Sequence, residues 1–261
     1  MSRTYVVTGS ASGIGRALTE RLREEGHTVV GVDINEADVQ VDLSSADGRR
    51  ALVEQVREAS GGRIDAIVAV AGLVAPKPVT VGVNYFGAIA TLEGLRPLLE
   101  GSDAPRAVVV ASLAALEETD AGLLRALHAE DEDAALAEAE RIGTAANAAG
   151  SSPIYTTTKL AVAQWVRRQA KTAEWAGAGI ALNAVAPGVI ETPMTLAALE
   201  SEEGRAALDA GAPSPLNGPA APPSAPAALL AWLAGSENTH VTGQVVFIDG
   251  GAESIRRPEL V

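Results

Sequence analysis

The sequence predicts an α/β protein whose doubly wound parallel sheet is covered by helices on both faces. Three observations favour this fold: short strand-like runs alternate with helix-patterned segments, these runs are apolar almost throughout, and a glycine loop follows the first of them. Strands of a parallel sheet are buried on both faces, so they are continuously apolar instead of alternating. No linker divides the 261 residues into two cores, and we therefore expect a single domain, 1–261.

The individual elements follow from local patterns in the chain. Short β-branched runs predict strands at residues 4–8, 27–33, 39–42, 65–70, 106–111, 180–185 and 244–248. Helical periodicity predicts a helix over 16–25 that ends at Gly26, and another that Ser44 caps and that runs to about Ala59. Further helices are expected at 84–99, 153–175 and 225–234.

Two segments depart from this alternation. Residues 117–140 hold nine acidic residues against one arginine and follow a strand where a short loop would suffice, which predicts a helical insertion at about 114–150. Its simplest interpretation is a pair of solvated surface helices. Residues 211–226 are too rich in proline and glycine for regular structure, and they belong to a substrate loop expected at about 190–226. That loop is either a passive connection or a lid over a ligand.

Composition excludes several classes of function. Lys and Arg number 20 against 33 Asp and Glu, a net charge of −13 that would repel nucleic acids and anionic membranes. The chain has no cysteine, and its three histidines lie far apart, so no metal site is expected. Neither a signal peptide nor a run of membrane-spanning length is recognisable, and we expect a soluble, cytoplasmic protein.

The loop from Gly9 to Gly15 lies between the first strand and the first helix. Glycine permits positive φ in such a turn and lets a pyrophosphate approach the backbone, while the helix N-terminus attracts the phosphate charge. Asp33 ends the second strand, where a carboxylate accepts hydrogen bonds from ribose hydroxyls and repels a 2′-phosphate. The expected cofactor is therefore NAD.

Tyr155 and Lys159 are four residues apart on one predicted helix, so their side chains share a face. A phenol has an ordinary pKa near ~10, and a neighbouring ammonium group is expected to lower it. Tyr155 is thus the candidate acid/base for a proton transfer.

At this point the sequence resembles the short-chain dehydrogenase/reductase family along nearly its whole length. The matching elements, in chain order, are Thr8 to Gly15, Asp42-Leu43, Ala71-Gly72, Asn84, Ser112, Tyr155 with Lys159, Pro187-Gly188, Thr192-Pro193 and Asp249-Gly250-Gly251. The stretch VNYFGA, the long insertion and the short tail are most similar to the bacterial 3α-hydroxysteroid dehydrogenase/carbonyl reductase group. One departure is Ala69-Val70-Ala71-Gly72, where the family usually has Asn-Asn-Ala-Gly.

The resemblance implies a Rossmann-type fold and roles for particular residues. Tyr155 would transfer the proton, Lys159 would also bind the nicotinamide ribose, Ser112 would bind the substrate oxygen, and Asn84 would hold a water in a relay to the lysine. The cofactor-binding residues that it implies are Gly9, Ser10, Ser12, Gly13, Ile14, Asp33, Ile34, Asp42, Leu43, Gly72, Tyr155, Lys159, Pro187, Gly188, Ile190 and Thr192.

The expected function is NAD(H)-dependent interconversion of a hydrophobic secondary alcohol, cyclic or steroid-like, and its ketone. An aromatic or primary alcohol dehydrogenase of the same family remains open, as does a protein that senses NAD without chemistry, although such proteins typically lose the tyrosine or the lysine. The glycine spacing and the short C-terminal half disfavour a sugar-nucleotide epimerase. A homo-oligomer is expected, a dimer in preference to a tetramer, because the acidic insertion enters just before Tyr155.

Overall fold

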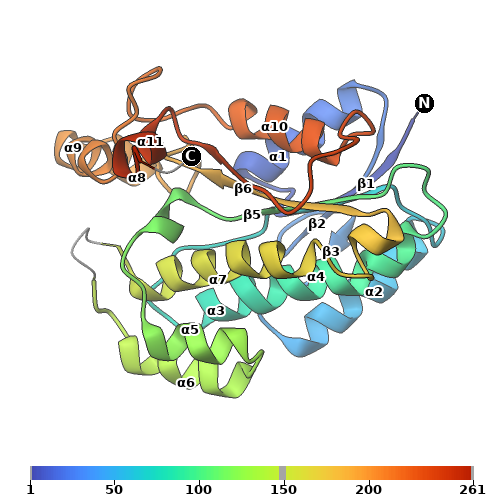
Figure 1. The fold of residues 1–261 in the computed structure, drawn as a ribbon, viewed down its shortest axis with the longest axis horizontal. Helices are drawn as coiled ribbons and strands as arrows, with labels where there is room; N and C mark the ends of the chain where they lie inside the picture. The colour runs from blue at the N-terminus through green and yellow to red at the C-terminus, as the bar shows by residue number, and fades with distance from the viewer. Residues whose placement is uncertain (1, 147–150, 260–261) are drawn as a thin grey trace.

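The computed structural model describes residues 2–146 and 151–259. Within them, seven parallel strands form one sheet in the order β3-β2-β1-β4-β5-β6-β7 (Figure 1). The strands are β1 (Thr4–Thr8), β2 (Thr28–Asp33), β3 (Val39–Gln40), β4 (Ala66–Ala69), β5 (Arg106–Val110), β6 (Ala181–Pro187) and β7 (Val245–Ile248). The predicted doubly wound sheet is confirmed.

The order of the strands alone predicts where in the fold a ligand-binding site should lie. β1 pairs with β2 on one side, Val6 opposite Val30, and with β4 on the other, Val6 opposite Ile67. The winding direction therefore reverses between β1 and β4. In open α/β sheets, ligands bind beyond the carboxyl ends of the strands at such a reversal.

Helices cover both faces of the sheet, and each face has its own core. On one face, α1 and α10 pack over strand residues such as Tyr5 and Val68; on the other, α2, α4 and α7 pack over residues such as Val6 and Ile67 (Figure 1). The α-helices are α1 (Gly13–Glu24), α2 (Ala46–Ala59), α3 (Val79–Val81), α4 (Ala88–Leu95), α5 (Ala121–His128), α6 (Glu132–Ile142), α7 (Pro153–Gln169), α8 (Leu196–Leu199), α9 (Glu202–Gly211), α10 (Ser224–Ala234) and α11 (Ala252–Arg256).

The acidic segment forms α5 and α6, which lie against α7 on the side away from the sheet (Figure 1). Each helix begins at an aspartate that accepts a backbone N–H: Asp120 from Leu123 at 2.8 Å and Asp131 from Ala134 at 3.0 Å. The inner stripe is apolar, and Leu123 and Leu127 are fully buried in the same core as α7. An interpretation as solvated surface helices therefore describes only the outer face of the pair.

Two helix boundaries differ from the sequence expectation. Ser45, not Ser44, caps α2 by accepting the N–H of Gly48 at 3.0 Å, because the Ser44 N–H is bonded to the Asp42 carboxylate. The helix expected at 84–99 begins earlier, at Val79, and passes through a π-helical turn at Gly82–Gly87.

A third boundary lies at the end of α7. The helix expected at 153–175 ends at Gln169, because the chain folds back there. The ring of Trp175 then packs edge-on against that of Trp165, with 6.0 Å between the ring centroids. Aromatic pairs favour this edge-to-face arrangement over a face-to-face stack.

The C-terminal third contains helices that the sequence expectation omitted, α8, α9 and α11. The proline-rich segment lacks regular structure over 212–223, but α10 already begins at Ser224 and includes Pro226 in its first turn. Proline is tolerated there because the first N–H groups of a helix have no intrahelical partner.

Candidate active site

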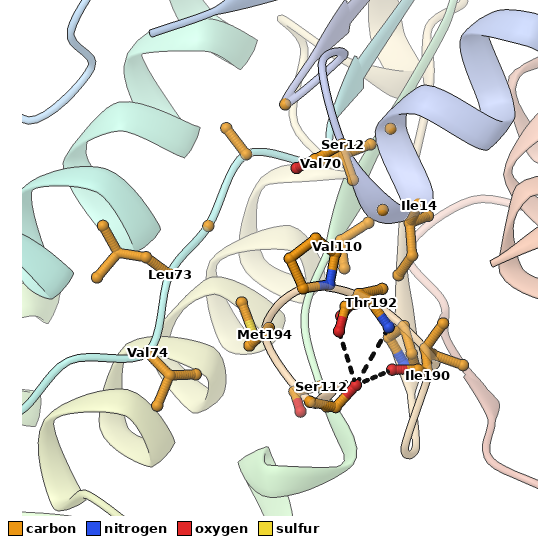
Figure 2. Close-up of a pocket in the computed structure, with 18 of the residues that line it drawn as sticks. Ser12, Ile14, Val70, Leu73, Val74, Val110, Ser112, Ile190, Thr192 and Met194 are labelled. Carbon is orange, nitrogen blue, oxygen red and sulfur yellow. Dashed lines mark hydrogen bonds between the residues drawn. The ribbon is translucent and has the colours of Figure 1, made fainter. Parts of the chain in front are cut away.

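A cavity of about 670 Å³ opens at the carboxyl ends of β1, β4, β5 and β6 (Figure 2). Its walls come from the glycine loop, the segment after β4, the end of β5, the start of α7 and the loop after β6. The lining residues are Gly9, Ser12, Gly13, Ile14, Gly15, Val70, Ala71, Gly72, Leu73, Val74, Val110, Ala111, Ser112, Tyr155, Lys159, Pro187, Gly188, Ile190, Thr192, Pro193, Met194 and Thr195.

The glycine loop forms a cradle that a side chain would fill. Gly9 has φ +71°, and a Cβ on it would lie 3.0 Å from the Cα of Ala71. Gly13, with φ +53°, faces the Thr192 side chain, which would lie 3.1 Å from a Cβ at that position. Ser12 precedes α1 without capping it through its side chain, so the first N–H groups of the helix are directed to the cavity. These features fit a bound pyrophosphate.

Asp33 lies beside this cradle at the end of β2. One oxygen of its carboxylate accepts the N–H of Ala11 at 3.1 Å, and the other accepts the N–H of Asn35 at 2.9 Å. The neighbouring Ile34 side chain is 60% exposed. The half-buried carboxylate thus fixes the glycine loop and lies at the side of the site where the proposed adenosine ribose would be.

Several of the expected cofactor-binding residues lie outside the cavity. Ser10 is directed to β2, since its Oγ lies 2.8 Å from where a Cβ on Gly31 would be. Asp42 is exposed, and its carboxylate accepts the N–H of Ser44, while Leu43 is buried in the core. None of these three residues lines the cavity.

The candidate catalytic group comes from β5 and α7. Ser112 lies two residues beyond the end of β5, and its Oγ accepts the N–H of Ala114 at 3.1 Å at the start of the short 3₁₀ turn. Lys159 is buried and donates from Nζ to the Val110 carbonyl at 3.0 Å. Its Nζ lies 5.7 Å from the centre of the Tyr155 ring. The three predicted side chains therefore meet at one end of the cavity.

Burial dominates the electrostatics of this group. It raises the pKa of the Tyr155 phenol above its ordinary value, against the opposing effect of a hydrogen bond with Ser112, and the Glu117 carboxylate raises it further. Burial likewise lowers the pKa of Lys159 to about 8. The direction for Tyr155 is opposite to that expected from the Tyr–Lys spacing. The reason is that desolvation disfavours the phenolate and the Lys159 ammonium is directed to a backbone carbonyl.

Asn84 lies in the π-helical turn and connects it to the segment after β4. Its amide accepts the N–H of Leu73 and donates to the Leu73 carbonyl, both at 2.9 Å. A Cβ on Gly72 would lie 3.3 Å from the Asn84 Oδ1 and 3.4 Å from the Lys159 Nζ, so this glycine backbone passes between the two side chains. π-Helical turns inside longer helices frequently occur at functional sites.

Thr8 compensates for the departure at Ala69 to Gly72. Its buried hydroxyl accepts the N–H groups of Val70 and Ala71, each at 3.1 Å. The backbone after β4 is thus held next to β1 without the two asparagines usual at these positions.

Hydrogen bonds of Thr195 and a β-bridge hold the loop after β6 in place. The Thr195 hydroxyl donates to the Ile190 carbonyl at 2.5 Å and accepts the Thr192 N–H at 3.1 Å (Figure 2). Ile190 also forms a short parallel bridge to Ala221. Met194 and Thr195 belong to the substrate loop expected at about 190–226, whereas Leu73 and Val74 line the cavity but were not among the expected site residues. The apolar stretch after β4 that contains Leu73 and Val74 was the available signal.

The described residues contain neither a metal-binding cluster nor a membrane-spanning helix. Among them, no cluster of three His, Cys, Asp or Glu side chains could hold a metal ion. Nor does any of the described helices combine the length and apolarity required to span a bilayer.

Comparisons with known proteins agree with this geometry. Residues 3–123 match the family model described as short chain dehydrogenase, and residues 125–253 match the one described as Enoyl-(Acyl carrier protein) reductase. The chain is 36% identical over 258 residues to the 3-alpha-hydroxysteroid dehydrogenase/carbonyl reductase of Comamonas testosteroni, with 97% of each chain covered. It is 32% identical to the cis-4-hydroxycyclohexanecarboxylate dehydrogenase of Sinomonas cyclohexanicum, again with 97% of each covered.

A solved structure is similarly close. The 3-alpha-hydroxysteroid dehydrogenase of Pseudomonas sp. B-0831, determined in complex with NADH, superposes with a TM-score of 0.87 at 36% identity. The match covers 99% of this chain and 100% of that chain.

Proposed function

The chain belongs to the short-chain dehydrogenase/reductase family, and we propose that it is an NAD(H)-dependent oxidoreductase that interconverts a hydrophobic secondary alcohol, cyclic or steroid-like, and its ketone. The observation that supports this most directly is the meeting of Ser112, Tyr155 and Lys159 at one end of a cavity whose other end is the N-terminus of α1. A dinucleotide bound at that N-terminus would extend toward the tyrosine.

The residues that would hold the cofactor are consistent with NAD(H). Gly9, Gly13 and the N-terminus of α1 would take the pyrophosphate, and Asp33 would accept hydrogen bonds from the adenosine ribose. Lys159 would bind the nicotinamide ribose, and Ile190 and Thr192 would enclose the nicotinamide from the loop after β6. A bound NAD⁺ would supply the hydride-accepting chemistry and a positive charge that favours the phenolate.

Tyr155 takes the hydroxyl proton during oxidation and returns it during reduction. Ser112 donates a hydrogen bond to the substrate oxygen and holds it beside the phenol. Lys159, with its lowered pKa, stabilises the phenolate when it is charged and can pass a proton onward in the direction of Asn84. Every one of these groups is on a rigid strand end or helix, which favours a fixed reaction geometry.

The cavity walls favour an apolar substrate. Leu73, Val74 and Met194 add apolar side chains to the cavity wall, and Val74 and Met194 are both 49% exposed (Figure 2). Among the described lining residues, Lys159 alone carries a charge, so no arginine is available to clamp a carboxylate or phosphate.

The proposal is tested by NADH formation with a panel of steroid, cyclic, aromatic and primary alcohols. Tyr155→Phe should lower kcat by about 10²- to 10⁴-fold while NADH binding persists, since only the proton-transfer group is lost. Tyr85→Phe is the matched control, because the Tyr85 hydroxyl is buried outside the cavity without a hydrogen-bond partner in the described chain. Equal activity of Tyr155→Phe and wild type would exclude the mechanism. Faster turnover of charged hydroxy acids or sugar phosphates than of cyclic alcohols would exclude the substrate class.

A further inference from the structure

An ion pair joins the C-terminal helix α11 to the segment that follows Ser112. The Arg256 Nη2 lies 3.7 Å from the Glu117 Oε1, and the two side chains are only 22% and 12% exposed. Partial burial reduces the screening that makes most surface ion pairs weak. Arg256 is the last residue of α11, whereas Glu117 ends the short 3₁₀ turn that begins after Ser112.

The segment that contains Glu117 is held in a fixed position relative to Tyr155. The Thr156 hydroxyl donates to the Glu118 carbonyl at 2.8 Å, and the Thr157 hydroxyl accepts the Asp120 N–H at 2.9 Å. Both threonines are fully buried and directly follow Tyr155 on α7. The Glu117 carboxylate therefore cannot move far from the phenol unless these bonds break.

The charged and titratable groups near the phenol come from three elements. Lys159 lies on the same helix, and Ser112 and Glu117 come from the segment after β5. Arg256 of α11 is the third contribution and acts through Glu117. The described cavity lining from the segment after β4 and the loop after β6 adds no charged side chain. Glu117 is thus the carboxylate that opposes ionisation of Tyr155, and it raises the pKa of the phenol.

We propose that Glu117 and Arg256 are positioning residues of the active site, and that Arg256 offsets the charge which the Glu117 carboxylate, held by the segment bonded to Thr156 and Thr157, exerts on Tyr155. This rests on the proposed role of Tyr155 as the acid/base. Removal of the guanidinium takes away a positive charge that offsets the Glu117 carboxylate, so the phenolate becomes less favourable. Removal of the carboxylate takes away the negative charge, so the phenolate becomes more favourable.

The two single variants should therefore shift the ionisation of Tyr155 in opposite directions. We expect Arg256→Gln to raise the apparent pKa of alcohol oxidation, seen in kcat/KM against pH, by about 0.5 to 1, and Glu117→Gln to lower it by about the same amount. The double variant should titrate close to the wild type, because the effects of the two opposite charges add at the phenol. Arg256→Lys keeps the charge and should restore the wild-type profile.

A second readout does not require any substrate. The chain has three tyrosines, Tyr5, Tyr85 and Tyr155, so protein labelled with ¹³C at the tyrosine ring gives three signals, and Tyr155→Phe identifies the third. The pH at which that signal titrates should shift between variants in the same order as the kinetic profile. Arg257→Gln is the matched control: it removes a charge at the adjacent position, where the guanidinium pairs with Glu253.

The outcomes separate this inference from the function proposed above. Opposite shifts in the two single variants support it. The inference is overturned if the Tyr155 titration is unchanged in both single variants. It is also overturned if the titration shifts in the same direction in both and the stability falls, since the ion pair would then have only a structural role. If the titrations shift as expected but no alcohol is oxidised with NAD⁺, the proposed function fails and the electrostatic coupling stands.

Discussion

Replacement of Asp33 by asparagine tests the proposed preference for NAD(H) over NADP(H). The Asp33 carboxylate ends β2 and already accepts two backbone N–H groups, from Ala11 at 3.1 Å and Asn35 at 2.9 Å. In the proposed complex the same carboxylate accepts hydrogen bonds from the ribose, and its charge repels a 2′-phosphate. The substitution removes the charge with almost no change of volume.

The magnitude follows from two contributions. A hydrogen bond to a charged group contributes about 1.5 to 3 kcal/mol, so the Kd of NADH should rise by roughly 10- to 100-fold. Relief of the repulsion between two charges about 5 Å apart near the surface should lower the Kd of NADPH by up to about 100-fold. Because both changes act on the ratio of the two constants, the preference for NADH should fall by roughly 100-fold or more.

The amide also affects the glycine loop. Asparagine has one acceptor oxygen, so one of the two backbone N–H groups now faces an NH₂ group, which costs about 1 kcal/mol of stability. Urea unfolding without cofactor measures this loss, and fluorescence titration measures both Kd values. Asp38→Asn is the control. The Asp38 carboxylate also accepts a backbone N–H of β2, that of Gly31 at 2.8 Å, but this bond lies two residues before Asp33. Tighter binding of NADPH than NADH by the wild type, or the same change of ratio in both variants, would refute the reasoning.

Three further predictions follow from burial and charge. The pKa of Lys159 is about 8 in the folded protein and 10.5 in the unfolded chain, so the unfolded chain binds more protons between these pH values. The free energy of unfolding, measured relative to that of Lys159→Met, should therefore rise by about 2 to 3 kcal/mol from about pH 8 to pH 10. A difference between the two proteins that does not change with pH in urea unfolding would contradict this. Leu127→Ala should destabilise the protein by about 2 to 4 kcal/mol in urea unfolding because the side chain is fully buried, whereas a cost below about 1 kcal/mol would show that α5 is dispensable to the core. Light scattering should find a dimer, since α5 and α6 cover α7 with an acidic outer face, and a stable tetramer would exclude this expectation.

The parallel sheet was predictable because each of its strands carries its own signal. Thr4 to Thr8 and Arg106 to Val110 are apolar runs without the alternation of a half-buried strand, and their burial on both faces is the physical cause. The glycine loop was predictable for a similar reason, since Gly9 and Gly13 adopt positive φ in the structure. The resemblance to the bacterial hydroxysteroid dehydrogenase/carbonyl reductase group is confirmed by the comparisons.

What the sequence could not supply depends on contacts between distant segments. The end of α7 at Gln169 is set by the packing of Trp175 on Trp165, and local periodicity contains no sign of that contact. The pKa of Tyr155 is shifted in the direction opposite to the expectation, because desolvation depends on the walls around the phenol, to which segments far apart in the sequence contribute. Thr8 as the acceptor for two N–H groups after β4 is likewise visible only once β1 and β4 are neighbours.

The threonines that follow Tyr155 limit how the acidic insertion can be exchanged between relatives. Because Thr156 and Thr157 are bonded to Glu118 and Asp120, the first residues of the insertion help to hold α7 in place and cannot be exchanged independently of it. A chimera spliced at residue 117 would exchange the hydrogen-bonding partners of the active-site helix together with α5 and α6. A splice point after Asp120 keeps them, so it is the boundary at which a grafted insertion of another length should leave Tyr155 in place.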